Sequence, residues 1–143
     1  PDTPLSAQTR GKITASQQAG VYPPVSLLFH DGTQRCMESA TLMYPKTLAV
    51  IQPGLGEFDY GGVSGRGLAA LGDDAILQAW TSAPLSEAGP EGESPYQLYA
   101  RVLRAFRSIT GEMCAKGLEQ AGIITYNSVI GVIMQRYCMQ RSR

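Results

Sequence analysis

SLLFHDGTQRCMES, residues 26–39, is the stretch that decides how the N-terminal half of the chain is expected to fold. An apolar run leads into His30, and the dipeptide Asp31-Gly32 follows it directly. Asp-Gly is a strong two-residue hairpin turn because both positions tolerate a positive φ. The stretch therefore predicts a hairpin in which residues 33–39 form the returning strand.

The predicted sheet continues after this hairpin. Residues 40–44 read ATLMY and residues 47–52 read TLAVIQ, and the dipeptide Pro45-Lys46 between them is a turn signal. Pro53-Gly54 then ends the β-rich pattern. We expect three or four antiparallel strands between residues 22 and 52.

Two amphipathic helices are predicted beyond this region. Ser94 and Pro95 are typical of an N-cap and a first helical turn, and Gly117 is typical of a helix stop. Apolar residues recur between them at steps of three and four, as on one face of a helix. A second stripe of this kind runs from Tyr126 to Cys138. The β-branched residues nearby also allow a strand, but the spacing favours a helix.

These patterns predict one domain over residues 1–143. Its parts are a polar N-terminal segment (1–20), a β-rich half with a glycine-rich loop (21–82) and a helical half (94–143). The N-terminal segment contains a short helix that Thr3 would cap. We expect an α+β fold, in which a small antiparallel sheet packs against a C-terminal pair of amphipathic helices.

Composition is typical of an ordered globular protein. Apolar residues make up 43% of the 143 residues and charged residues 17%, which argues against disorder. The sequence has no apolar run near the roughly 20 residues that a membrane-spanning helix needs. The formal net charge is zero, but residues 101–143 carry seven basic groups against two acidic ones. This asymmetry suggests either compensation within one fold or a basic face for an acidic partner.

Three cysteines, Cys36, Cys114 and Cys138, leave the redox state open. They form no CxxC pair and the chain has one histidine, so we expect no metal site. Either one disulfide joins two of them or all three are buried free thiols. A catalytic pair of His30 and Cys36 is not expected, because the predicted hairpin separates the two by roughly 10 Å.

The glycine-rich loop at residues 54–72 is the strongest candidate for a ligand site. It has neither the Gly-Lys-Ser/Thr ending of a Walker loop nor a full G-x-G-x-x-G motif. Arg66 could hold an anion among its backbone amides. The neighbouring aromatic residues Phe58 and Tyr60 are candidates for an interface or for the core.

A basic ridge is predicted on the first of the two helices. Arg101, Arg104 and Arg107 are spaced by three residues on the side opposite the apolar stripe. Such a ridge is usually a solvated helix face, and it has no interleaved aromatic residues. Nucleic acid is therefore an unlikely partner, although the ridge could bind an acidic surface.

Three functional hypotheses follow from these observations. The main one is a non-enzymatic protein–protein interaction module in the bacterial periplasm or outside the cell: a secretion-system component, an immunity protein or an inhibitor. It rests on the lack of a convincing set of catalytic residues, on a first residue, Pro1, that suggests processing, and on one possible disulfide. It implies a protein partner, no cofactor and no catalytic residues. The alternative is a small ligand-binding protein or enzyme that uses Arg66, and the third is an acidic-partner binder that uses the basic ridge.

Overall fold

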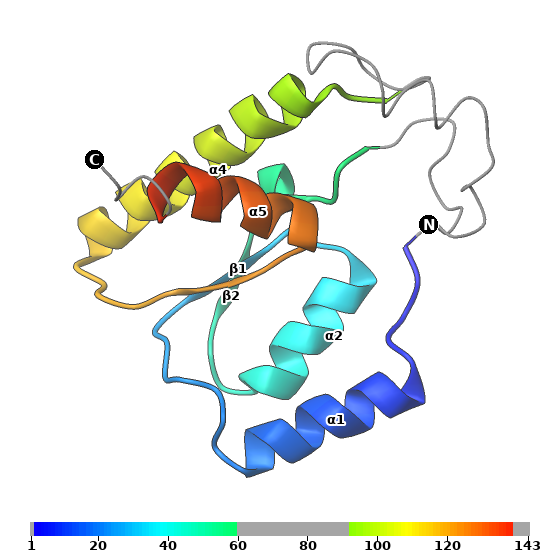
Figure 1. The fold of residues 1–143 in the computed structure, drawn as a ribbon. Coiled ribbons are helices and arrows are strands. Elements are labelled where there is room, and N and C mark those ends of the chain that lie inside the picture. The colour runs from blue at the N-terminus through cyan, green and yellow to red at the C-terminus, as the bar shows by residue number, and fades with distance from the viewer. Residues whose placement is uncertain (1, 60–91, 139–143) are drawn as a thin grey trace, which may run out of the picture.

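The structure is a computed structural model, and it describes residues 2–59 and 92–138 (Figure 1). Its elements are, in chain order, α1 (Ala7–Gln18), β1 (Leu28–His30), α2 (Gln34–Met43), β2 (Ala49–Ile51), the 3₁₀ helix η1 (Pro53–Leu55), α4 (Pro95–Lys116), β3 (Gly122–Ile124) and α5 (Asn127–Tyr137).

The sheet is parallel, so the predicted antiparallel sheet is wrong. Its strands lie in the order β2-β1-β3, and Leu28 in the central strand is in register with Ala49 on one side and Gly122 on the other. All four residues from Leu27 to His30 are buried. Such a continuous buried run is typical of a parallel strand that is covered on both faces, whereas a half-exposed antiparallel strand alternates.

The predicted returning strand is helix α2. Gly32 does adopt the positive φ of 89° that an Asp-Gly turn suggests. The chain then enters a helix with Thr33 at its N-cap, and residues Cys36 and Ala40 bury one face of that helix. Parallel strands cannot be joined by a tight turn and need a crossover, and α2 is the crossover between β1 and β2. The expected strand at residues 40–44 is the end of this helix.

The two helices predicted in the C-terminal half are present, but this half also contributes a strand to the sheet, which was not predicted. Ser94 Oγ accepts a hydrogen bond from the backbone of Gln97 (3.1 Å), and the Gln97 side chain accepts one from the backbone of Ser94 (2.7 Å). This capping box starts α4, and Gly117 ends it with a φ of 64°. The second predicted helix is present as α5, after the short strand β3.

Helices cover the sheet on two sides, as Figure 1 shows. Helices α4 and α5 pack against one face, and α2 packs against the other; α1 lies outside α2. The main core lies between the sheet and α4 with α5, and its buried members are Leu27, Phe29, Leu55, Leu98, Val102, Ala105, Ile109 and Val129.

The N-terminal helix begins later than the sequence suggested. Its cap is Ser6, whose side chain accepts a hydrogen bond from the backbone of Thr9, and not Thr3. No residue of α1 is buried. The helix is held to α2 by Glu38, which binds Arg10 at 2.7 Å and the backbone N–H of Leu5 at 2.8 Å.

Candidate functional site

The carboxyl ends of β1 and β3 bring together polar side chains from distant parts of the sequence. Asp31 follows β1 directly, and Tyr126 lies between β3 and α5. Ligands of open parallel sheets bind at this edge, outside the carboxyl ends of the strands. Helices α2 and α5 also begin here, so both turn the positive ends of their dipoles towards this edge.

Asp31, Thr33 and Tyr126 form a chain of hydrogen bonds. Asp31 Oδ1 accepts from the Thr33 backbone N–H (2.9 Å) and from the Thr33 hydroxyl (2.8 Å). The Thr33 hydroxyl also lies 2.9 Å from the Tyr126 hydroxyl. A carboxylate only accepts, so the single Thr33 proton is given to Asp31. It follows that the Tyr126 hydroxyl donates to Thr33.

Arg35 lies beside these three hydrogen-bonded residues, and one of its donors has no hydrogen-bond partner. Its guanidinium carbon is 5.6 Å from the centre of the Tyr126 ring, within the range of a cation–π contact. Its Nε is buried and makes no hydrogen bond in the structure. A buried N–H of a cation without an acceptor is costly, and proteins rarely leave one so. The Nε–H of Arg35 is therefore a donor that an anionic ligand could use.

The surroundings fix the charges of these groups. Burial alone would raise the pKa of Asp31, but hydrogen bonds from Thr33, with smaller effects of Cys36 and Tyr126, outweigh it and lower that pKa. Burial raises the pKa of the Cys36 thiol. Burial likewise raises the pKa of Tyr126, to about 12. At neutral pH the cluster thus holds one carboxylate, a neutral thiol, a neutral phenol and the Arg35 cation.

His30 faces the other side of the sheet. Successive strand residues point to opposite faces, so Phe29 enters the core below α4 while His30 lines a cavity of about 240 Å³ with Ala40 and Tyr44. Its Nδ1 accepts the backbone N–H of Gly32 at 3.0 Å, and burial lowers its pKa against a weaker opposing effect of Asp31. In the described part of the chain no hydrogen bond joins His30 to Cys36.

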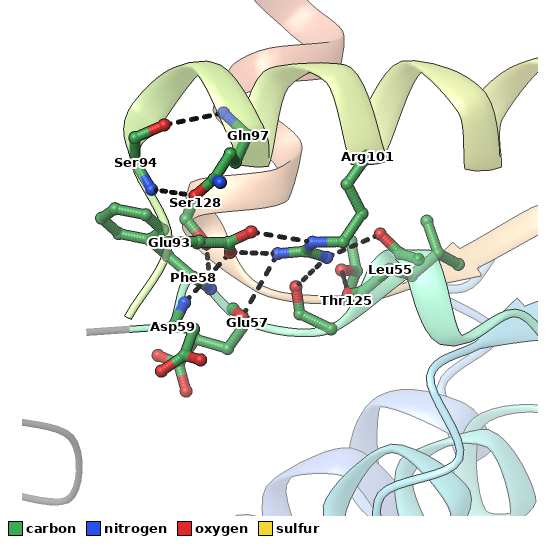
Figure 2. A network of polar contacts seen from close by, with 12 residues as sticks. Leu55, Glu57, Phe58, Asp59, Glu93, Ser94, Gln97, Arg101, Thr125 and Ser128 are labelled. Carbon is green, nitrogen blue, oxygen red and sulfur yellow. Dashed lines mark hydrogen bonds and ion pairs between the residues drawn. The ribbon is translucent and has the colours of Figure 1, made fainter. Parts of the chain in front are cut away.

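The predicted basic ridge is divided in the structure. Figure 2 shows the Arg101 guanidinium turned inward, where it donates to the carbonyl groups of Gly54 (2.8 Å) and Gly56 (2.9 Å) and pairs with Glu93 (2.6 Å). Arg104 and Arg107 are exposed. Arg101 is therefore a structural anchor of α4, and the three arginines do not present one common surface.

The remaining predicted residues are not part of the cluster. Phe58 is partly buried against the main core, and its backbone N–H donates to Ser128 Oγ at 3.3 Å. Tyr60, Arg66 and most of the glycine-rich loop lie outside the described residues. Cys114 and Cys138 are exposed and Cys36 is buried, and all three are free thiols. The disulfide that the sequence allowed is not formed in the structure.

Two further findings concern the described residues alone. Within 2–59 and 92–138, no group of three or more His, Cys, Asp or Glu side chains is arranged to hold a metal ion. Within the same ranges, no helix has the length and apolar character required to cross a membrane.

Sequence reasoning missed Thr33, Arg35 and Tyr126 and assigned Asp31 only a role in a turn. The available signal was the buried run of β1 followed at once by Asp, Thr and Arg. Once that run is read as a parallel strand, the polar residues after it fall at the ligand-binding edge of the sheet. The hairpin prediction concealed this position.

Solved structures with the same fold include two phosphatases and a phosphoglycerate mutase. The chain resembles α-ribazole phosphatase from Shigella flexneri with a TM-score of 0.78 and 19% identity, over 95% of this chain and 68% of that one. For a putative α-ribazole-5'-P phosphatase from Escherichia coli K-12 the TM-score is 0.77 at 20% identity, over 94% and 68%. For phosphoglycerate mutase from Bacillus anthracis it is 0.75 at 14% identity, over 99% and 72%.

A family model agrees with this fold. Residues 1–141 match the model of the histidine phosphatase superfamily, branch 1, and the chain belongs to that superfamily. No curated protein matches the sequence.

Membership of an enzyme superfamily contradicts the main functional prediction. The chain is not a non-enzymatic interaction module, and the comparisons do not support a periplasmic, secretion-associated or immunity role. They agree better with the alternative, a small ligand-binding protein or enzyme. The predicted protein partner and the predicted location stay predictions.

Proposed function

We propose that this chain binds the phosphate group of a small phosphate monoester at the carboxyl ends of β1 and β3, as part of a phosphatase or a related phosphoryl-transfer enzyme. The observation that carries the proposal is Arg35, whose Nε is buried without an acceptor at that edge. Membership of the histidine phosphatase superfamily and the phosphorylated compounds in the names of the similar enzymes support the same class of ligand.

The chemistry of Arg35 suits a phosphate group. A guanidinium presents its donors in a rigid plane, and that plane matches two oxygens of a phosphate better than an ammonium group does. Arg35 is the second residue of α2, so the positive end of the helix dipole lies next to it. The first amide of this helix, the N–H of Gln34, already donates to a carboxylate, Asp2 Oδ1, at 2.7 Å. The dipole and the planar donors of Arg35 both favour an anion at this end of α2.

The neighbouring groups leave the positive charge of Arg35 available. Asp31 is the nearby carboxylate of the cluster, and its Oδ1 already accepts two hydrogen bonds from Thr33. Cys36 and Tyr126 are neutral at pH 7, because burial raises the pKa of each. No ion pair of Arg35 is present among the described residues. A phosphate oxygen would satisfy the Nε donor and balance this charge.

Replacing Arg35 tests the proposal. We expect Arg35→Ala to weaken the binding of inorganic phosphate, measured by calorimetry, by about 10- to 100-fold, since a charge-assisted hydrogen bond contributes about 1.5–3 kcal/mol. Arg35→Lys keeps the charge but loses the planar donors, so its affinity for phosphate should lie between those of the wild type and Arg35→Ala.

Arg104→Ala is the matched control, because it removes an exposed arginine from α4 and should leave the dissociation constant unchanged. Equal phosphate affinity in Arg35→Ala and the wild type, with both proteins folded, would refute the proposed site.

A further inference from the structure

We propose that Asp31, Thr33 and Tyr126 act as a positioning relay, which holds the Tyr126 ring against the Arg35 guanidinium and so orients that guanidinium for phosphate. The inference rests on the proposed function, because it assigns a role to three further residues of the same site. None of the three needs to touch the phosphate for this role.

The relay starts from a fixed point. Asp31 is the first residue after β1, and its Oδ1 holds both the backbone N–H and the hydroxyl of Thr33. Two bonds from one residue to one oxygen leave the Thr33 side chain little rotational freedom. The lone pairs of its hydroxyl oxygen therefore point in a defined direction, towards Tyr126.

The second step links two strands. The Thr33–Tyr126 hydrogen bond joins residues 93 positions apart, one after β1 and the other after β3. It fixes the far end of the Tyr126 side chain to the end of the central strand. The phenol stays protonated at any physiological pH, because its pKa is raised to about 12, so this donor is permanent.

The third step reaches Arg35. The Tyr126 ring lies 5.6 Å from the guanidinium carbon, and a guanidinium prefers the face of an aromatic ring. The flexible arginine side chain thereby gains a defined position although its Nε has no protein acceptor. A donor that is oriented before the ligand arrives loses less entropy on binding.

Substitutions at Thr33 separate the relay from simple packing. Thr33→Val keeps the shape of the side chain and removes the hydroxyl, whereas Thr33→Ser keeps the hydroxyl and removes a methyl group. Thr33 is the N-cap residue of α2, but its side chain makes no capping hydrogen bond, so the valine variant does not uncap the helix. Tyr126→Phe breaks the same hydrogen bond from the other side.

Two measurements are made on each variant. The first is the NMR chemical shift of the Arg35 Nε–H group without phosphate, which senses the ring current of Tyr126. We expect it to move towards the value of a free arginine in Thr33→Val and to stay near that of the wild type in Thr33→Ser. The second is the affinity for inorganic phosphate, which should fall about fivefold in Thr33→Val and in Tyr126→Phe. The double variant should lose no more affinity than either single variant, because both changes break the same hydrogen bond.

The two measurements distinguish the two proposals. An unchanged Arg35 signal in Thr33→Val overturns the relay whether or not phosphate binds. Equal loss of affinity in Thr33→Val and Thr33→Ser also overturns it, because packing alone would then explain the effect. If the wild type and Arg35→Ala bind phosphate equally, the proposed function fails, while the Arg35 signal still reports on the relay.

Discussion

His30 and Tyr126 both lie near the carboxyl ends of the strands, but their surroundings give them different roles. His30 is a strand residue that points towards α2, where its ring is buried and its Nδ1 takes the N–H of Gly32. Tyr126 lies beyond its strand, at the edge of the sheet, where its hydroxyl meets Thr33. The histidine is therefore part of the packing between β1 and α2, and the tyrosine belongs to the candidate site.

The buried histidine predicts a dependence of stability on pH. Burial lowers the pKa of His30 in the folded protein below the ordinary value of 6.5, so the unfolded chain binds a proton first as the pH falls. The free energy of unfolding should be highest above pH 6.5 and decrease from there towards the lowered pKa. Urea unfolding at pH 7.5 and 5.0 measures this change.

His30→Asn is the control for that experiment, since the Asn Oδ1 can accept the Gly32 N–H but does not titrate. The pKa of Asp31 is also lowered, from 3.8, so its contribution to stability is lost only at more acidic pH and does not enter this range. A decrease of the same size in His30→Asn would show that another group causes it.

At the scale of elements, short contacts between η1 and α4 set the geometry of the chain after β2. Gly54 lies so close to α4 that a Cβ atom there would be 2.7 Å from the Cβ of the buried Ala105. A glycine is needed at that point because of this approach, and not because of an unusual φ. Gly111 in the middle of α4 has open space around it instead.

These two glycines give opposite predictions. Gly54→Ala should lower the free energy of unfolding by about 1–3 kcal/mol, because well-packed elements must separate to admit the methyl group. Gly111→Ala should raise it by about 0.5–1 kcal/mol, since alanine restricts the unfolded chain and favours the helix. Chemical denaturation of both variants checks this, and a neutral Gly54→Ala would contradict the close approach.

For the whole molecule, Arg101 connects segments that are far apart in the sequence. Its guanidinium joins α4 to the carbonyl groups of Gly54 and Gly56 and to Glu93, as Figure 2 shows. The side chains of Arg101 and Glu93 are 24% and 16% exposed, so the pair is only partly reached by water. Because water reaches the Arg101 guanidinium only in part, these protein acceptors stabilise its charge in place of water.

Arg101→Met should therefore destabilise the protein by about 2–3 kcal/mol. It leaves the carbonyl groups of Gly54 and Gly56 without this donor, and it removes the cation that pairs with Glu93, which keeps the hydrogen bond from the backbone of Asp59. Arg104→Met, a change of the same type at an exposed position three residues along, should stay within about 0.5 kcal/mol of the wild type. Thermal or urea unfolding compares the two. Similar losses in both variants would mean that Arg101 is a surface residue after all.

The sequence by itself determined the features that depend on neighbouring residues. Ser94, Pro95 and Gly117 act through the backbone within a few positions, so they predicted the start and the end of α4. The spacing of apolar residues likewise predicted α5. Even the positive φ of Gly32 follows from its local sequence.

Only the tertiary structure decided how these pieces are joined. An Asp-Gly turn is compatible with a hairpin and with a strand-to-helix connection, and the choice depends on which surfaces become buried. Here Cys36 and Ala40 bury one face of α2, so this segment is a helical crossover and β2 runs parallel to β1. That same choice brings Thr33 and Arg35 to Tyr126, a residue from the other end of the chain, and no local pattern could have paired them.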